Sequence, residues 1–128
     1  MTHLVPKHKC DDDACAALAA ASDQDVIPYI SDLLQCLQDL NWPIAGPVAD
    51  RLSRLGHELV EPITEVLSGT DEIWKYWIVS HLLHNVREEV YRALLFKLNH
   101  IRRKPTPDER VEEVHDAVCS LLASRGLR

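Results

Sequence analysis

The sequence contains very little glycine and no glycine-rich loop. Its four glycines stand at positions 46, 56, 69 and 126, each at a plausible helix boundary. A phosphate-binding loop needs several glycines in one short segment, and the nucleophile of many serine hydrolases sits in a G-x-S-x-G turn. Neither pattern occurs in the 128 residues. Nucleotide binding of that type and serine-based catalysis therefore have no support in the sequence.

Strand signals and long apolar runs are also missing. No segment alternates β-branched and polar residues between turn signals, so we do not expect a β-sheet. No apolar run approaches the roughly 20 residues that cross a bilayer. The N-terminus lacks the apolar stretch of a secretory signal. We therefore expect a cytoplasmic protein that does not contact a membrane.

Closely spaced cysteine pairs are absent as well. The four cysteines, at 10, 15, 36 and 119, form no C-x2-C motif, and a zinc ribbon requires such pairs. In a cytoplasmic protein we expect these thiols to be reduced.

Positive charge is scarce. There are 14 Lys and Arg residues against 20 Asp and Glu residues, which gives a formal net charge of -6. Nucleic-acid binding relies on cationic side chains that neutralise phosphates, and the same holds for anionic membranes. The composition therefore makes nucleic acid an unlikely ligand and favours a protein partner with a basic surface.

One basic run does occur, "HIRRK" at residues 100–104. Arg102, Arg103 and Lys104 come at the end of an expected helix, where cations complement the helix dipole. A weak nucleic-acid contact through Arg102–Lys104 is the alternative interpretation of this run.

The pattern that dominates the sequence is a recurrence of apolar residues every three or four positions, which is typical of amphipathic helices. We predict an all-α protein of about seven helices arranged in antiparallel hairpins. The expected helices cover residues 14–21, 24–37, 43–55, 58–68, 72–84, 85–103 and 107–125. The third has an irregular first turn after Asn41, or its regular part starts at Gly46–Pro47. The length suits one domain over residues 1–128, with an irregular N-terminal segment at 1–10.

A degenerate internal repeat suggests how these helices are arranged. Pro28 and Pro62 are 34 residues apart, and Trp42 and Trp74 are 32 apart. A helix pair that recurs after 30-odd residues is typical of an α-solenoid. We therefore predict HEAT-like stacking of helical hairpins, with an irregular helical bundle as the alternative.

The two tryptophans stand at equivalent corners of this repeat. Asp39 and Asn41 precede Trp42, and Asp71 precedes Trp74. In a structural interpretation, the acidic or amide side chain caps the second helix of the hairpin. The indole then packs between neighbouring helix pairs, and its N–H finds a hydrogen-bond acceptor.

The same corners also suggest a binding edge, because equivalent turns lie side by side in stacked repeats. Aromatic anchors with acidic neighbours could hold a partner protein there. The candidate binding residues are Asp39, Asn41, Trp42, Asp71, Trp74, Lys75 and Tyr76.

Histidine spacing offers a weaker hypothesis. His81 and His84 are spaced so that they share one face of their expected helix, and His115 and Cys119 share one face of another helix. A zinc site needs three or four converging ligands, so a carboxylate such as Asp116 would have to join a pair. Such spacings are common on helices, and we expect no metal and no other cofactor.

Three stretches resemble a known family. They are "LVPKHKCDDDACAAL", "LLQCLQDLNWPIA" and "DEIWKYWIVSHLL", which lie within residues 4–84. They are similar to the hallmark stretches of a small bacterial family catalogued as domain of unknown function 5071. The resemblance implies a compact, helical, bacterial cytosolic protein, and it implies no activity, substrate or catalytic residue.

The function is unknown at this stage, and a non-catalytic protein-interaction module agrees best with these observations. An adaptor, a regulatory protein or a toxin-neutralising protein would fit. A metal-dependent enzyme that uses His81 and His84, or His115, is the alternative, together with weak nucleic-acid binding.

Overall fold

A computed structural model describes residues 4–6, 11–38 and 43–126. These residues form helices and turns, and none of them lies in a β-strand, which confirms the all-α prediction. The elements are α1 (Asp12–Ala20), α2 (Asp23–Val26), η1 (Ile27–Tyr29), α3 (Ile30–Gln35), α4 (Ala45–Ser53), η2 (His57–Leu59), α5 (Val60–Ser68), α6 (Glu72–Trp77), η3 (Ile78–Leu82), α7 (Glu88–Arg103), α8 (Pro107–Val111) and α9 (Val114–Arg125).

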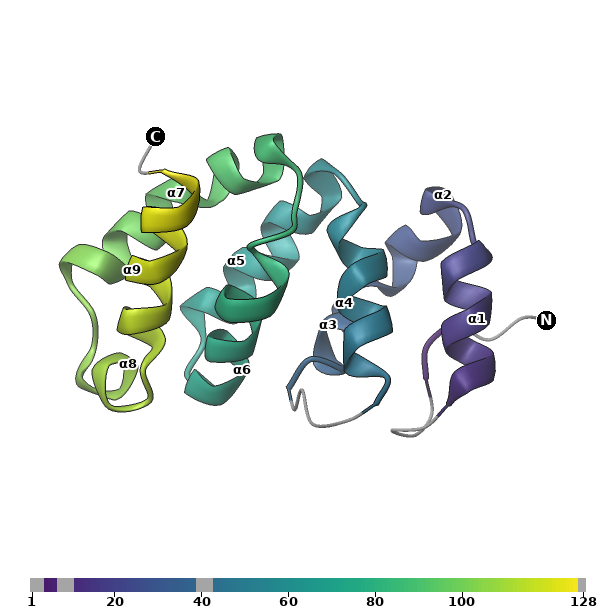
Figure 1. The fold of residues 1–128 in the computed structure, drawn as a ribbon, viewed down its shortest axis with the longest axis horizontal. Coiled ribbons are helices and arrows are strands. Elements are labelled where there is room, and N and C mark those ends of the chain that lie inside the picture. Colours follow the sequence, from purple (N-terminus) through teal and green to yellow (C-terminus); the bar gives the residue numbers. More distant parts are fainter. Residues whose placement is uncertain (1–3, 7–10, 39–42, 127–128) are drawn as a thin grey trace.

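The helices lie in two layers (Figure 1). One layer contains α1, α4, α6 with η3, and α9, and the other contains α3, α5 and α7. Neighbours within a layer contact each other, as do α3 with α4, α5 with α6 and α7 with α9 across the layers. Successive antiparallel hairpins therefore pack side by side, and the specific relation to HEAT repeats stays a prediction.

Local sequence signals start several helices. The side chains of Asp11, Ser22, Asp71 and Thr106 each accept a hydrogen bond from the backbone N–H three residues further on. Such capping satisfies a backbone donor that has no partner inside the helix. The cap at Asp71 agrees with the sequence prediction.

One hydrophobic cluster joins the two layers. It extends from Leu18 in α1 to Leu122 in α9 and includes residues from α3, α4, α5, η3 and α7. Burial of this apolar surface is the main favourable term in folding. In the segment 72–84, much of the apolar surface is buried. Ile78, Val79 and Leu82 have no measurable exposure.

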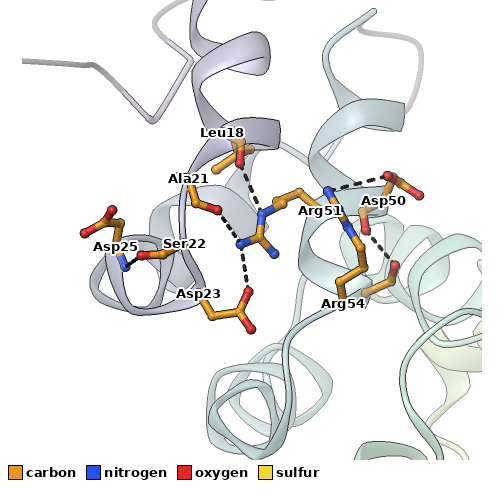
Figure 2. A network of polar contacts seen from close by, with 9 residues as sticks. Leu18, Ala21, Ser22, Asp23, Asp25, Asp50, Arg51 and Arg54 are labelled. Carbon is orange, nitrogen blue, oxygen red and sulfur yellow. Dashed lines mark hydrogen bonds and ion pairs between the residues drawn. The ribbon is translucent and has the colours of Figure 1, made fainter.

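A buried arginine fastens α4 to the turn between α1 and α2 (Figure 2). Arg51 donates from Nε to the Leu18 carbonyl at 3.1 Å and from Nη2 to the Ala21 carbonyl at 3.0 Å. The same Nη2 lies 2.7 Å from Oδ1 of Asp23. The guanidinium thus satisfies carbonyls that the end of α1 leaves without helical partners.

A second arginine does the same at the far end of the chain. Arg125 of α9 donates to the carbonyls of Leu83 and Val86, both at 2.8 Å, in the turn between η3 and α7. It also lies 3.3 Å from Glu88 and stacks 4.5 Å from the ring centre of Tyr91. Each clamp therefore ties one helix to the turn that precedes it in the stack.

The last expected helix is divided in two, contrary to the prediction of one helix over 107–125. Glu113 adopts φ 66, the left-handed conformation, and separates α8 from α9. Val111 is 74 % exposed as a result, whereas Val114 and Val118 are buried. The break lets α8 turn Glu109 into the interior, where it meets Lys75.

The start of α4 is close to one of the two predicted starts. The helix begins at Ala45, after Ile44 and without a side-chain cap, next to the predicted start at Gly46–Pro47. The other predicted start depended on Asn41, which lies outside the described residues.

Candidate functional site

The corner before α6 has the predicted structural role. Asp71 accepts a hydrogen bond from the Trp74 backbone N–H at 3.1 Å and so caps the helix. The Trp74 indole packs against the hydrophobic cluster, and its Nε1 donates to the Leu34 carbonyl at 2.9 Å. Trp74 therefore joins α6 to α3, as a wedge between neighbouring helix pairs. The equivalent corner at Asp39, Asn41 and Trp42 lies outside the described residues.

Lys75 lies in the interior and not on an exposed edge. Its side chain is 4 % exposed, and its Nζ lies 3.0 Å from Oε1 of Glu72 and 3.2 Å from Oε2 of Glu109. Burying an ammonium group is costly unless it is paired and hydrogen-bonded. The sequence prediction missed this because Glu109 lies 34 residues away, beyond any helical spacing.

Tyr76 faces a different side of α6 from Trp74. It lines a hollow of about 300 Å³ between α6–η3 and α9, together with Ser80, His84, Glu113, Asp116, Ala117 and Ser120. Trp74 instead borders a separate hollow with residues of α3 and α5. The structure therefore does not bring Trp74, Lys75 and Tyr76 together on one surface.

Exposed and half-exposed aromatic and histidine side chains surround Tyr76. We call this surface the α6 face and define it by Ile73, Tyr76, Trp77, Ser80, His81 and His84. Spacings of three and four residues place them on one side of the helix. The Tyr76 and Trp77 rings meet edge to face at 5.0 Å, and Trp77 lies 5.3 Å from His81. Ile73 adds an apolar side chain that is 56 % exposed.

The backbone beneath this face is a short π-helix. In η3, the Leu83 N–H reaches the Ile78 carbonyl, five residues back, and the Ser80 hydroxyl donates to the Tyr76 carbonyl. Single π-helical turns are rare and often mark functional sites. The wider turn keeps Val79, Leu82 and Leu83 buried while Ser80 borders the hollow.

The opposite wall of the hollow carries negative charge. Glu113 and Asp116 are exposed carboxylates on the α8–α9 turn and α9. Within the described residues, neither pairs with Lys or Arg, and Asp116 lies 3.9 Å from His115 Nδ1. Burial, together with the neighbouring His84, lowers the pKa of His81, which favours its uncharged ring. The α6 side of the hollow is thus aromatic, and beside it stand two carboxylates that pair with no Lys or Arg among the described residues.

The candidate ligands of the alternative metal hypothesis do not converge within the described residues. Among residues 4–6, 11–38 and 43–126, no three His, Cys, Asp or Glu side chains are grouped so as to hold a metal ion. His115 Nε2 lies 3.1 Å from the Arg102 carbonyl and 3.7 Å from Cys119 Sγ. This ring links α9 to α7 and is already engaged.

The basic run lies at the end of α7, on a separate part of the molecule. Arg103 and Lys104 border a hollow of about 420 Å³ with Phe96, Asn99 and His100. Arg102 is half-buried, and its Nε donates to Asn99 at 3.2 Å. The run therefore presents two exposed cations beside an exposed phenylalanine.

Sequence reasoning missed the α9 half of the site. Glu113 and Ser120 border the hollow, but neither belongs to a motif or to the repeated corners. Glu112 and Glu113 gave no local signal of a turn, because glutamate is a good helix former. Which helix packs against α6 depends on the tertiary fold.

The sequence was compared with known proteins and with models of protein families. No curated protein matches the sequence. In the described part of the chain, no helix is both long enough and apolar enough to cross a bilayer. A family model described as "Domain of unknown function (DUF5071)" matches residues 4–122. Because this match covers nearly the whole sequence and confirms the resemblance drawn from the three stretches, the chain belongs to the DUF5071 family.

Proposed function

We propose that this protein is a non-catalytic interaction module that binds a basic segment of another protein on the α6 face. The observation that carries the proposal is the hollow between α6–η3 and α9. Glu113 of the α8–α9 turn and Asp116 of α9 line this hollow together with Tyr76 of α6. We further propose a bacterial cytosolic location, which agrees with the free thiols of Cys15, Cys36 and Cys119.

The chemistry of the hollow suits a lysine or arginine side chain. A carboxylate forms its strongest hydrogen bonds with a charged donor, and an aromatic ring attracts a cation that lies over its face. Ser80 and Ser120 supply hydroxyl groups that can accept further N–H donors. A volume of about 300 Å³ is large enough for one long side chain.

The remainder of the α6 face can contact the apolar part of such a segment. Ile73 and Trp77 flank the hollow on the same helix, and exposed aromatic side chains are common anchors in protein interfaces. The formal net charge of -6 would also raise the association rate of a basic partner. A partner segment that alternates basic and apolar residues fits both features.

A labelled peptide of alternating arginine and leucine residues tests this proposal by fluorescence anisotropy. We expect saturable binding at physiological salt that weakens at least about tenfold in the Asp116→Lys variant, because the pocket then repels the guanidinium. Glu61→Lys is the matched control, since Glu61 is an exposed acid on α5 in the other layer. It makes the same charge change away from the hollow.

Equal loss of affinity in both variants would show that binding depends only on net charge and would contradict the proposed site. Unchanged affinity in Asp116→Lys would contradict it as well.

A further inference from the structure

A second hollow, which shares no lining residue with the hollow beside Tyr76, is bordered by the buried Lys75 on another side of α6. It has a volume of about 270 Å³ and lies between the end of α5, α6, the second half of α7 and α8. We call it the Lys75 cavity. The side chains on which the inference depends are Glu72, Lys75, Lys97, Lys104, Asp108 and Glu109, all part of its wall. No residue of the α6 face and neither Glu113 nor Asp116 belongs to this wall.

The inner part of the wall is a buried group of three charges. The side chains of Lys75, Glu109 and Glu72 are 4 %, 6 % and 11 % exposed. With both carboxyl groups ionised, the group has one negative charge in excess. A buried excess charge is strongly unfavourable unless something compensates for it.

The hydrogen bonds show where compensation is missing. Glu109 uses both oxygens, because Oε1 accepts from the Thr106 backbone N–H at 2.8 Å and Oε2 contacts Lys75. Oε1 of Glu72 also contacts Lys75. Oε2 of Glu72 is buried and has no hydrogen-bond partner within the described residues. Glu72 itself borders the cavity, so a rotation of its carboxylate toward the cavity would let this enclosed oxygen accept a hydrogen bond from a ligand that brings a donor.

The outer part of the wall has the opposite charge. Lys97 is half-exposed and Lys104 is exposed, and neither forms an ion pair within the described part of the chain. His100 lies between them in sequence and also borders the cavity. The ammonium groups of Lys97 and Lys104 would attract an anion to this part of the cavity.

The whole wall is therefore close to neutral, but its charges are separated. Glu72, Asp108 and Glu109 oppose Lys75, Lys97 and Lys104. A simple cation would satisfy Glu72 and be repelled by the outer lysines. A simple anion would meet the lysines and leave the Glu72 oxygen without a donor. A ligand that carries both charges can satisfy both ends.

We propose that the Lys75 cavity binds a small zwitterion, whose ammonium group donates to Glu72 and whose carboxylate pairs with Lys97 and Lys104. The polar wall favours a short aliphatic amino acid over an aromatic ligand. No bond is made or broken at this site, which acts in binding alone.

Isothermal titration calorimetry with β-alanine, γ-aminobutyrate and δ-aminovalerate tests the site, because these probes place the two charges at increasing separations. We expect at least one of them to bind with a dissociation constant of about 1 mM or below. Pentylamine and pentanoate, which carry one charge each, should bind at least about tenfold more weakly than the best zwitterion. Failure of all three zwitterions, or pentylamine that binds equally well, would overturn the proposal.

Two variants assign binding to the cavity. Glu72→Gln removes the acceptor charge with little change in shape, and the double variant Lys97→Ala/Lys104→Ala removes the outer cations. Each should weaken the best probe at least about tenfold. Arg103→Ala, an exposed cation on α7 outside this wall, should not.

Should Glu72→Gln fail to fold, the double lysine variant decides, because its positions lie at or near the surface. Unchanged affinity in the double variant would overturn the proposal even if the α6 face binds its basic partner. Because the two hollows share no wall residue, the two proposals fail independently.

Discussion

Single side chains join helices that are distant in sequence. Trp74 reaches the Leu34 carbonyl across 40 residues, and Lys75 reaches Glu109 across 34. The first contact is a hydrogen bond from a half-buried indole, and the second is a buried ion pair. The two residues are neighbours in sequence but hold α6 against different elements.

Trp74→Ala should lower the free energy of unfolding by about 3 kcal/mol, since truncating a large core aromatic usually costs 3 to 5 kcal/mol and this ring is only half-buried. Urea denaturation measures the change. Ile73→Ala is the matched control, because its exposed side chain should matter by less than about 0.5 kcal/mol. A loss in Trp74→Ala no larger than in the control would contradict the wedge.

The ionisation of Glu109 makes the stability of the protein depend on pH. Burial alone would raise the pKa of Glu109, but the hydrogen bond from the Thr106 N–H and the contact with Lys75 outweigh burial and lower it. The unfolded state therefore binds a proton at a higher pH than the folded state does. The contribution of Glu109 to stability is present above the ordinary glutamate pKa of 4.5 and is lost as the pH falls through its lower folded pKa.

We expect the free energy of unfolding to fall more steeply below this pH in the wild type than in Glu109→Gln, which cannot titrate. Thermal unfolding between pH 7 and acid, followed by circular dichroism, makes the comparison. Glu61→Gln, at an exposed position on α5, should retain the wild-type slope. Parallel curves for the wild type and Glu109→Gln would refute the assignment.

Between helices, the two arginine clamps fix the order of stacking. Arg51 binds the turn between α1 and α2, and Arg125 binds the turn between η3 and α7. In both, a helix of one layer grips the turn after its neighbour in that layer. The acidic residue that completes each clamp, Asp23 or Glu88, stands at the start of the next helix.

Arg51→Met should lower the free energy of unfolding by about 2 kcal/mol or more, because it leaves the carbonyls of Leu18 and Ala21 without this donor. The rate of amide hydrogen exchange should also increase more in α1 than in α7. Arg54→Met, an exposed change on the same helix, provides the control. A uniform change in exchange across all helices would argue against a local clamp.

At the α8–α9 junction, in contrast, we expect a substitution to stabilise the protein. Glu113 holds φ 66, which is unfavourable for a residue with a Cβ. Glu113→Gly should therefore raise the free energy of unfolding by about 0.5–1 kcal/mol, while it removes a carboxylate from the proposed peptide site. Guanidinium denaturation and peptide anisotropy on the same variant measure both effects. Destabilisation would show that the Glu113 side chain makes contacts that outweigh the strain.

Whether an interaction could be predicted from the sequence depended on how far apart its partners lie in the chain. Caps at Asp11, Ser22 and Asp71 were predictable, because an acceptor and its N–H donor are three residues apart. The burial of Lys75 was not, because its second partner is supplied by another helix. The break at Glu113 was also missed, since left-handed positions are usually occupied by glycine or asparagine.

For the molecule as a whole, the two layers keep one hydrophobic cluster continuous from α1 to α9 and place different chemistry on different surfaces. The α6 face carries aromatic side chains beside the carboxylates of Glu113 and Asp116, and the end of α7 is basic. The Lys75 cavity lies apart from the α6 face and carries both signs. A rigid helical stack of this kind can present several binding surfaces without changing its core.

The most direct test is a nuclear magnetic resonance titration of the isotope-labelled protein with the arginine–leucine peptide. We expect the largest shifts at Tyr76, the Trp77 indole N–H, Ser80 and Ser120, with little change in α3 and α5. Shifts centred on the exposed acids of α3 and α5 instead, or no saturable shifts at all, would contradict the assignment of partner binding to the α6 face.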